Sequence, residues 1–256
     1  MYGAELPFGD PSVAALSSAQ RAAIAGHWKH RARSELQVGR AFAAMVPLLR
    51  EHRASSAVLD RLERGAEEEE RHSEICARLA EAYAGEAVAR PKIDSVPLPR
   101  FGVGDEALET ALLVAGMCCV NETIATAWIG ACLAAAETPL AEMANRIHLH
   151  DEIEHARVGW AHLGSDAVSD ATRRALGPRL PKLLEANAPG WERDDPSLPA
   201  EGVPAHGHLA AAVSRRVFID AVAELVLPGF AHVGVDIGPA RAWLAQRAAP
   251  ADRQRG

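Results

Sequence analysis

The segment 148–155 reads HLHDEIEH and places three histidines and three acidic residues in an otherwise alanine-rich, apolar neighbourhood. A helix turns about 100° per residue, so side chains three, four and seven positions apart share one face. His148, Glu152 and His155 have this spacing. A second Glu-x-x-His motif lies in the segment 66–74, AEEEERHSE. One such motif alone is typical of a solvated face with ion pairs, so the pair of motifs has to be judged against the rest of the chain.

The composition favours a globular cytoplasmic protein. The chain has 256 residues, of which 48% are hydrophobic, and this is enough for a sizeable core. A net charge of -7 argues against a nucleic-acid partner, which needs a basic surface. The N-terminus, MYGAELPFGDPS, has neither the basic nor the apolar region of a secretory signal. No C-x-x-C pair is present, so we expect reduced, buried cysteines at Cys76, Cys118, Cys119 and Cys132.

The segment 107–136 is apolar enough to raise the question of a membrane span. Asn121 and Glu122 divide it, leaving apolar runs of 10 and 14 residues. Both runs are shorter than the roughly 18 residues that a spanning helix needs. We therefore expect no membrane partner and a central helix of a soluble bundle.

Helical periodicity dominates the chain, and alternating strand patterns are nearly absent. Ser17 with Gln20 forms a capping-box pattern, Gly85 is a helix-ending residue, and Thr138 before a proline is a helix start. The segment 86–103 holds three prolines and is interpreted as a long crossover between two helical pairs. The four long helices are expected at about 18–51, 54–85, 105–136 and 138–164.

The remaining residues predict a helical extension. A helix is expected at 166–185 and a surface loop at 186–207. His206, His208 and His232 lie in loop-like contexts and should be solvated. A further helix should cover 211–226 and break at Pro228-Gly229, followed by a short last helix at 239–248. We treat residues 1–256 as a single domain, with a four-helix core at 18–164 and a C-terminal extension at 165–256.

Each of the four long helices carries one glutamate on its apolar stripe near mid-length. Glu122 lies in the most apolar segment of the protein, where an unpaired carboxylate is costly and is normally neutralised, paired or bound to metal. His72 and His155 each follow one of these glutamates by three residues. The four glutamates are Glu35, Glu69, Glu122 and Glu152.

This pattern matches a two-metal site. Four carboxylates neutralise two divalent ions, and two neutral imidazoles complete a ligand set that leaves room for oxygen. One Glu from each of two helices, with Glu-x-x-His from each of the other two, is the arrangement of di-iron and di-manganese carboxylate bundles. Residues 18–164 therefore resemble the ferritin-like di-iron superfamily. The resemblance implies an all-α, ferritin-like four-helix bundle with a long crossover and extra C-terminal helices.

The superfamily also suggests roles for residues beside the motifs. Glu68 and Asp151 directly precede the two motif glutamates. In the superfamily an acidic residue there often hydrogen-bonds the ligand histidine of the other motif and fixes its tautomer. A solvated Glu-rich run competes with this interpretation for Glu68. Arg71 matches the superfamily pattern, whereas Glu154 stands where a second arginine is expected.

Two further residues resemble those of particular families within this superfamily. His148, one turn before Glu152, resembles the extra histidine ligand of the p-aminobenzoate N-oxygenase family. A core histidine is the equal alternative. Thr126, one turn after Glu122, resembles the threonine that faces the oxygen pocket in bacterial multicomponent monooxygenases. The alternative is a threonine hydroxyl bonded to the carbonyl of Glu122.

The resemblance implies a non-heme di-iron oxygenase or oxidase, such as a monooxygenase. Two iron ions, or manganese in their place, would activate O₂ to oxidise a small organic substrate. An amine N-oxygenase is implied if His148 binds metal. Electrons would come from an external donor, and a homodimer stays open. Thr126 is the candidate catalytic residue, and the candidate metal ligands are Glu35, Glu69, His72, Glu122, His148, Glu152 and His155.

Other function classes share this ligand pattern. Ferroxidase or iron-storage proteins and peroxide-detoxifying ferritin-like proteins are the enzyme alternatives. The storage proteins usually end soon after a short fifth helix, so the extension of about 90 residues counts against them and favours a covered substrate pocket. A helical binding module without chemistry is disfavoured by the intact ligand positions.

Overall fold

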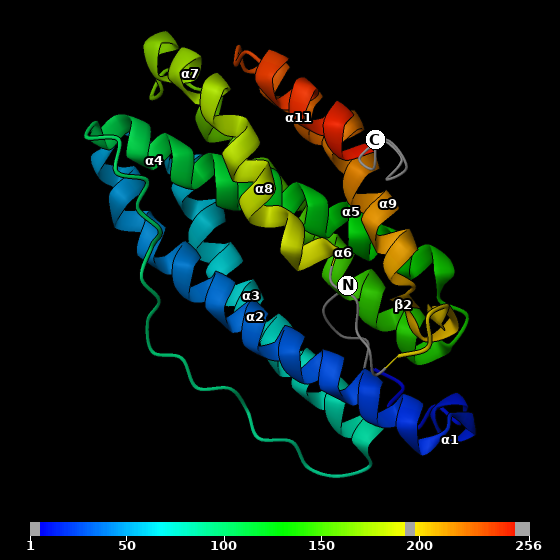
Figure 1. Cartoon of the computed structure of the whole chain (residues 1–256). Helices are drawn as coiled ribbons and strands as arrows, with labels where there is room; N and C mark the ends of the chain where they lie inside the picture. Colours follow the sequence, from blue (N-terminus) through cyan, green and yellow to red (C-terminus); the bar gives the residue numbers. More distant parts are fainter. Residues whose placement is uncertain (1–5, 193–197, 249–256) are drawn as a thin grey trace.

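Helices make up most of the chain, and the predicted all-α class is confirmed (Figure 1). The computed structural model describes residues 6–192 and 198–248. Strands in the described part are limited to one antiparallel pair, β1 (Gly202–Val203) and β2 (His208–Leu209), with Gly202 opposite Leu209.

The long helices begin and end close to the positions that the capping signals predict. Ser17 and Gln20 form the capping box, Gly85 ends its helix in the left-handed region at φ 74°, and the Thr138 side chain accepts from the backbone of the first turn. The elements are α1 (Ser12–Ala15), α2 (Ser18–Glu51), α3 (Ser56–Ala84), α4 (Glu106–Val114), the π-helix η1 (Ala115–Asn121), α5 (Glu122–Ala135) and α6 (Pro139–Leu163).

Four long helical rods pack side by side. α2 and α3 form one pair, and the continuous rod α4–η1–α5 forms the second pair with α6. The segment 86–105 contains no helix or strand and runs back along the first pair, so that α3 and α4–α5 point in the same direction (Figure 1). Arg40 donates to the carbonyl of Ile93 at 2.9 Å and so holds this segment against α2. One core cluster joins all four rods through Phe42, Leu62, Leu112 and Val158.

The rod of residues 106–135 has the length and apolarity of a membrane span, with a mean hydropathy of 1.5 in its most apolar window. Within that window 67% of the residues are buried inside the protein. Gly159 of α6 lets the two rods approach closely, because a Cβ there would lie 2.6 Å from the Cys119 sulfur. The apolarity is therefore that of a helix packed in the protein core.

The C-terminal extension differs from the sequence expectation in its boundaries. It contains α7 (Asp170–Leu176), η2 (Gly177–Arg179), α8 (Leu180–Trp191), η3 (Pro204–His206), α9 (Ala211–Ala221), the π-helix η4 (Val222–Val226), α10 (Leu227–His232) and α11 (Gly238–Ala248). In place of the single helix predicted at 166–185, α7 and α8 follow one another with the short 3-10 helix η2 between them. α8 runs on to Trp191 because Leu183, Leu184 and Ala188 are buried. The predicted loop therefore begins later, and its residues 193–197 lie outside the described part.

The expected break at Pro228-Gly229 is wrong. Pro228 is the second residue of α10 and directly follows the π-helix η4, and the helical path continues from η4 to His232. Gly229 faces the Trp160 ring so closely that an added Cβ would lie 2.8 Å from it. This glycine serves helix packing instead of ending the helix.

Candidate metal centre

Glutamates from three different helices meet in the middle of the protein. Ligand atoms of Glu69, Glu122, Glu152 and His155 all lie within 4.8 Å of one another, and all four residues are buried. Glu69 comes from α3, Glu122 is the first residue of α5, and the other two lie on α6. Glu122 directly follows the π-helix η1, a kind of irregularity that often occurs at functional sites.

Two histidine nitrogens and two carboxylate oxygens of this centre are buried without a hydrogen-bond partner. The Nδ1 atom of His72 lies 3.6 Å from Glu69 and 3.5 Å from Glu152. The Nδ1 atom of His155 lies 3.2 Å from Glu69 and 3.4 Å from Glu152. Each unsatisfied buried polar atom costs about 1–3 kcal/mol. Two cations, each between one imidazole and these two carboxylates, would satisfy all of them, so the residues fit a two-metal centre.

The Nε2 atoms of the two imidazoles make the hydrogen bonds that the resemblance to the superfamily implies. The Nε2 of His72 donates to Asp151 at 3.1 Å, and the Nε2 of His155 donates to Glu68 at 3.0 Å. Each histidine is therefore bonded to the acidic residue of the other motif, which directs its Nδ1 towards the centre. Arg71 donates to Asp151 at 2.8 Å. Glu154 is half exposed and takes no part, because it pairs with arginines at the surface.

Burial and crowding change the acidity of the centre. Burial, together with the charges of Glu152 and Glu69, raises the pKa of Glu122 well above its usual value. Burial lowers the pKa of His72, but its hydrogen bond to Asp151 and the nearby charges of Glu69 and Glu152 outweigh burial and raise it to about 10. Burial likewise opposes protonation of His155, yet its carboxylate neighbours raise its pKa well above 6.5. Without metal, the centre therefore holds protons where the ions would be.

The Glu35 side chain also lies at the centre, where it pairs with Arg31, a partner that the sequence analysis did not anticipate. Arg31 donates to Glu35 from Nε at 3.1 Å and from a terminal nitrogen at 2.8 Å. The buried guanidinium lies over the rings of Trp28 and Trp128, at 5.0 and 5.7 Å from their centroids. Burial raises the pKa of Glu35 to about 7, although Arg31 opposes the rise. The i, i+4 spacing of this pair was the available signal.

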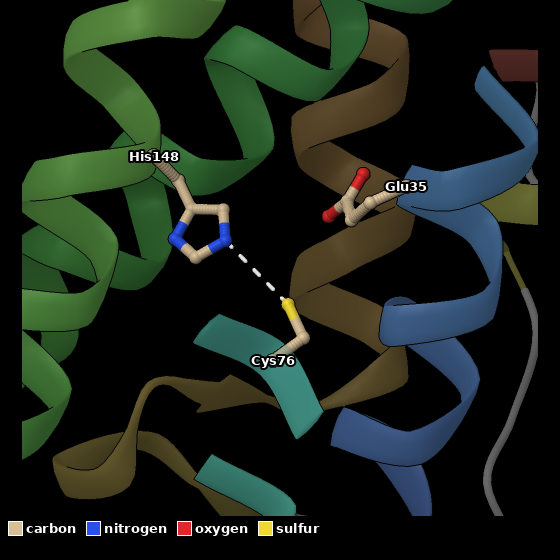
Figure 2. A group of neighbouring side chains, drawn as sticks. All are labelled: Glu35, Cys76 and His148. Atoms are coloured by element: carbon tan, nitrogen blue, oxygen red, sulfur yellow. Dashed lines mark hydrogen bonds between the residues drawn. The ribbon is translucent and has the colours of Figure 1, made fainter. Parts of the chain in front are cut away.

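His148 is fully buried and lies beside His72, with ring centroids 4.5 Å apart. Its Nδ1 donates to the carbonyl of Ala144 at 2.8 Å, which leaves the lone pair on Nε2. That nitrogen faces the Cys76 sulfur at 3.5 Å. Glu35, Cys76 and His148 form a second group whose ligand atoms lie within 4.8 Å of one another (Figure 2).

Thr126 does not have the placement expected of a residue facing an oxygen pocket. Its hydroxyl lies 2.8 Å from the carbonyl of Glu122 and 3.1 Å from the carbonyl of Glu152. The residues that line the large cavity do not include it. The structure thus agrees with the alternative of a helical threonine bonded back to its own helix, here with an added link to α6.

A cavity of about 1140 Å³ opens directly from the centre. Glu35, Glu122 and Glu152 lie at its inner end, while Trp191 of α8 and His208 of β2 line the part supplied by the extension. His208 is only 2% exposed, so the expectation of solvated loop histidines is wrong for it. His206 is also buried and bonds the Tyr83 hydroxyl at 2.9 Å. The extension folds over the bundle and shields both rings from water.

No family model, curated protein or solved structure matches this chain. The function proposed below is therefore argued from the positions and chemistry of these side chains.

The hydrogen bond between Asp151 and His72 gives the first test. Asp151→Asn should weaken metal binding by about 10–100-fold, because a neutral amide orients the imidazole poorly and leaves it less basic. Competition with a fluorescent chelator measures the affinity. Glu154→Gln, a matched change at a half-exposed position of the same helix, should leave it unchanged. Equal affinities in the two variants would contradict the role of Asp151.

Proposed function

We propose that this protein is a ferritin-like di-iron oxidoreductase that uses O₂ to oxidise a small organic molecule. The proposal rests on one observation: the carboxylate cluster and a large cavity share the same residues. The four carboxylates of the centre, Glu35, Glu69, Glu122 and Glu152, also line a cavity large enough for an organic substrate. A substrate in this cavity would lie directly against the metal ligands.

The residues divide naturally between two metal positions. His72, Glu35 and His148 would hold one ion, and Glu122 with His155 would hold the other. Glu69 and Glu152 each lie within 3.6 Å of the Nδ1 atoms of both His72 and His155 and would complete the ligand set. Two bound iron ions would supply the redox chemistry needed to activate O₂, and manganese would suit the same donors. Electrons would come from an external donor, since the sequence has no flavin or iron–sulfur motif.

The protein itself orients the ligands and shapes the substrate space. Asp151 and Glu68 keep the Nδ1 atoms of the two motif histidines directed inward. Trp128 and Trp191, with ring centroids 6.2 Å apart, form an aromatic wall of the cavity. The Trp128 indole donates to Ser214 at 3.2 Å, which joins the bundle to the extension. Such a wall suits a planar or apolar substrate and keeps water from the reacting atoms.

The extension favours this proposal over iron storage or peroxide removal. Those activities need access only for an ion or a very small oxidant, whereas this cavity is large and partly aromatic. Within the oxygenase class, the place of His148 beside His72 supports amine N-oxygenation. One iron would then have two histidines and the other one. Mössbauer spectra of the iron-loaded protein should show two iron environments that become more alike in His148→Ala.

Metal content and oxygen uptake together test the function. We expect about two iron ions per chain and O₂ consumption with a chemical reductant. Glu122→Ala should lower iron occupancy and slow O₂ consumption by about 100-fold or more, since it removes a ligand that the second ion needs. Glu74→Ala, which changes an exposed glutamate of the same protein, is the control. A wild-type protein that stays metal-free after anaerobic iron loading would overturn the assignment.

A further inference from the structure

Cys76 lies among the candidate metal ligands, although nothing in the di-iron pattern calls for a sulfur atom there. It follows His72 by four residues on α3, so it lies one turn further along the same face. Glu35 approaches it from α2 and His148 from α6 (Figure 2). All three residues contribute ligand atoms to one compact group.

The neighbours of Cys76 are arranged to accept a cation. The Nδ1 of His148 is occupied by the Ala144 carbonyl, so its Nε2 presents a lone pair towards the sulfur. The adjacent His72 has a fully buried Nδ1 without a hydrogen-bond partner. Glu35 uses one carboxylate oxygen for Arg31, and the bonds to Arg31 leave the other oxygen unused. Sulfur, nitrogen and oxygen donors thus surround one point of the interior.

We propose that Cys76 binds one of the two metal ions as a thiolate, together with Glu35 and His148. This inference rests on the proposed two-metal centre. The incoming ion takes the place of the thiol proton, which leaves to solvent, and no redox change is involved. The buried guanidinium of Arg31 offsets the negative charge that the sulfur gains. The second ion, near Glu122 and His155, receives only nitrogen and oxygen donors.

The two metal positions would consequently differ in preference. Thiolate ligands favour softer ions such as zinc or cobalt, whereas carboxylate-rich sites suit manganese and ferrous iron. A sulfur donor at one position would make the two positions fill in a defined order, also when both ions are iron. Cys76 is then a residue that determines metal specificity.

Cobalt substitution tests the inference directly. The chelated full-length protein is reloaded with Co(II) alone, and its absorption spectrum is recorded. Thiolate bonded to Co(II) gives an intense near-ultraviolet charge-transfer band, which carboxylates and imidazoles do not give. We expect this band in the wild type and in Cys132→Ser, a matched change of another buried cysteine. Cys76→Ser and Cys76→Ala should lack it and should bind the second cobalt at least about tenfold more weakly.

Each result has a distinct meaning. Two bound cobalt ions without a charge-transfer band in the wild type would overturn the role of Cys76 and leave the proposed function intact. A band that survives in Cys76→Ser would also overturn it. A wild type that binds no cobalt at all would contradict both proposals. Absence of the band in the wild type is decisive by itself and does not depend on the folding of any variant, whereas a band in the wild type is assigned to Cys76 by its loss in Cys76→Ser.

Discussion

Removal of the metal ions should lower the melting temperature of this protein by about 10–20 °C. Two ions present at 100 times their Kd would each add about 2.7 kcal/mol to the free energy of unfolding. For a chain of this size, each kcal/mol corresponds to roughly 2–4 °C. The effect is large because the same ions also neutralise carboxylates that the fold has buried together.

The chelated protein should in addition lose stability as the pH rises. Burial raises the pKa of Glu122, and it raises that of Glu35 to about 7, so ionisation of either group is harder in the folded state than in the unfolded state. Their penalty grows as pH rises above the ordinary glutamate value. His72 acts in the same direction: its raised pKa adds stability below about 6.5, and that stability is lost as pH rises through about 10. The loaded protein avoids both losses.

Differential scanning calorimetry with and without chelator, between pH 5.5 and 8.5, measures these effects. The gap between the two melting temperatures should widen with pH. Glu122→Gln is the informative variant, because it removes the charge but keeps the shape. Without metal it should melt above the wild type at high pH, and it should gain less from metal. Identical melting curves before and after verified metal removal would contradict the two-metal centre.

The apparent affinity for the pair of metal ions should rise at least about tenfold for each pH unit near neutrality. The pKa of His72 is raised to about 10, so its imidazole carries a proton at pH 7 when the ions are absent. The pKa values of Glu122 and His155 are raised as well. Binding the pair of ions releases the His72 proton, and the Cys76 thiol proton as well if the sulfur binds an ion. Each released proton contributes one power of ten per pH unit. Affinity is therefore lost as the pH falls.

Proton release can be counted independently of affinity. Anaerobic addition of Mn(II) or Co(II) to the weakly buffered, chelated protein should release at least about one proton per pair of ions at pH 7. Chelator competition between pH 6.5 and 7.5 should show the matching slope. Glu122→Gln should release fewer protons than the wild type, since burial raises the pKa of Glu122 and the amide has no proton to lose. Metal binding that is independent of pH would show that the imidazoles and carboxylates are not the ligands.

The sequence predicts the long helices and much of the centre because both depend on local rules. Ser17, Gly85 and Thr138 act within a turn of their own helices, so they determine where those helices begin or end. The Glu-x-x-His spacing likewise places Glu152 and His155 on one face of one helix, whatever surrounds it. The bonds of Glu68 and Asp151 to the opposite histidines follow once α3 and α6 are neighbours.

Other parts of the site were decided by tertiary packing. Cys76 and His148 are 72 positions apart and meet only because of how α3 and α6 are rotated about their axes. The burial of His208 and the aromatic wall at Trp191 depend on where the extension lies against the bundle. The spacing between residues in the sequence determines which of them share one face of a helix. Which neighbour that face meets is settled by the packing of the whole core, because close packing leaves few ways for all the faces to fit at once.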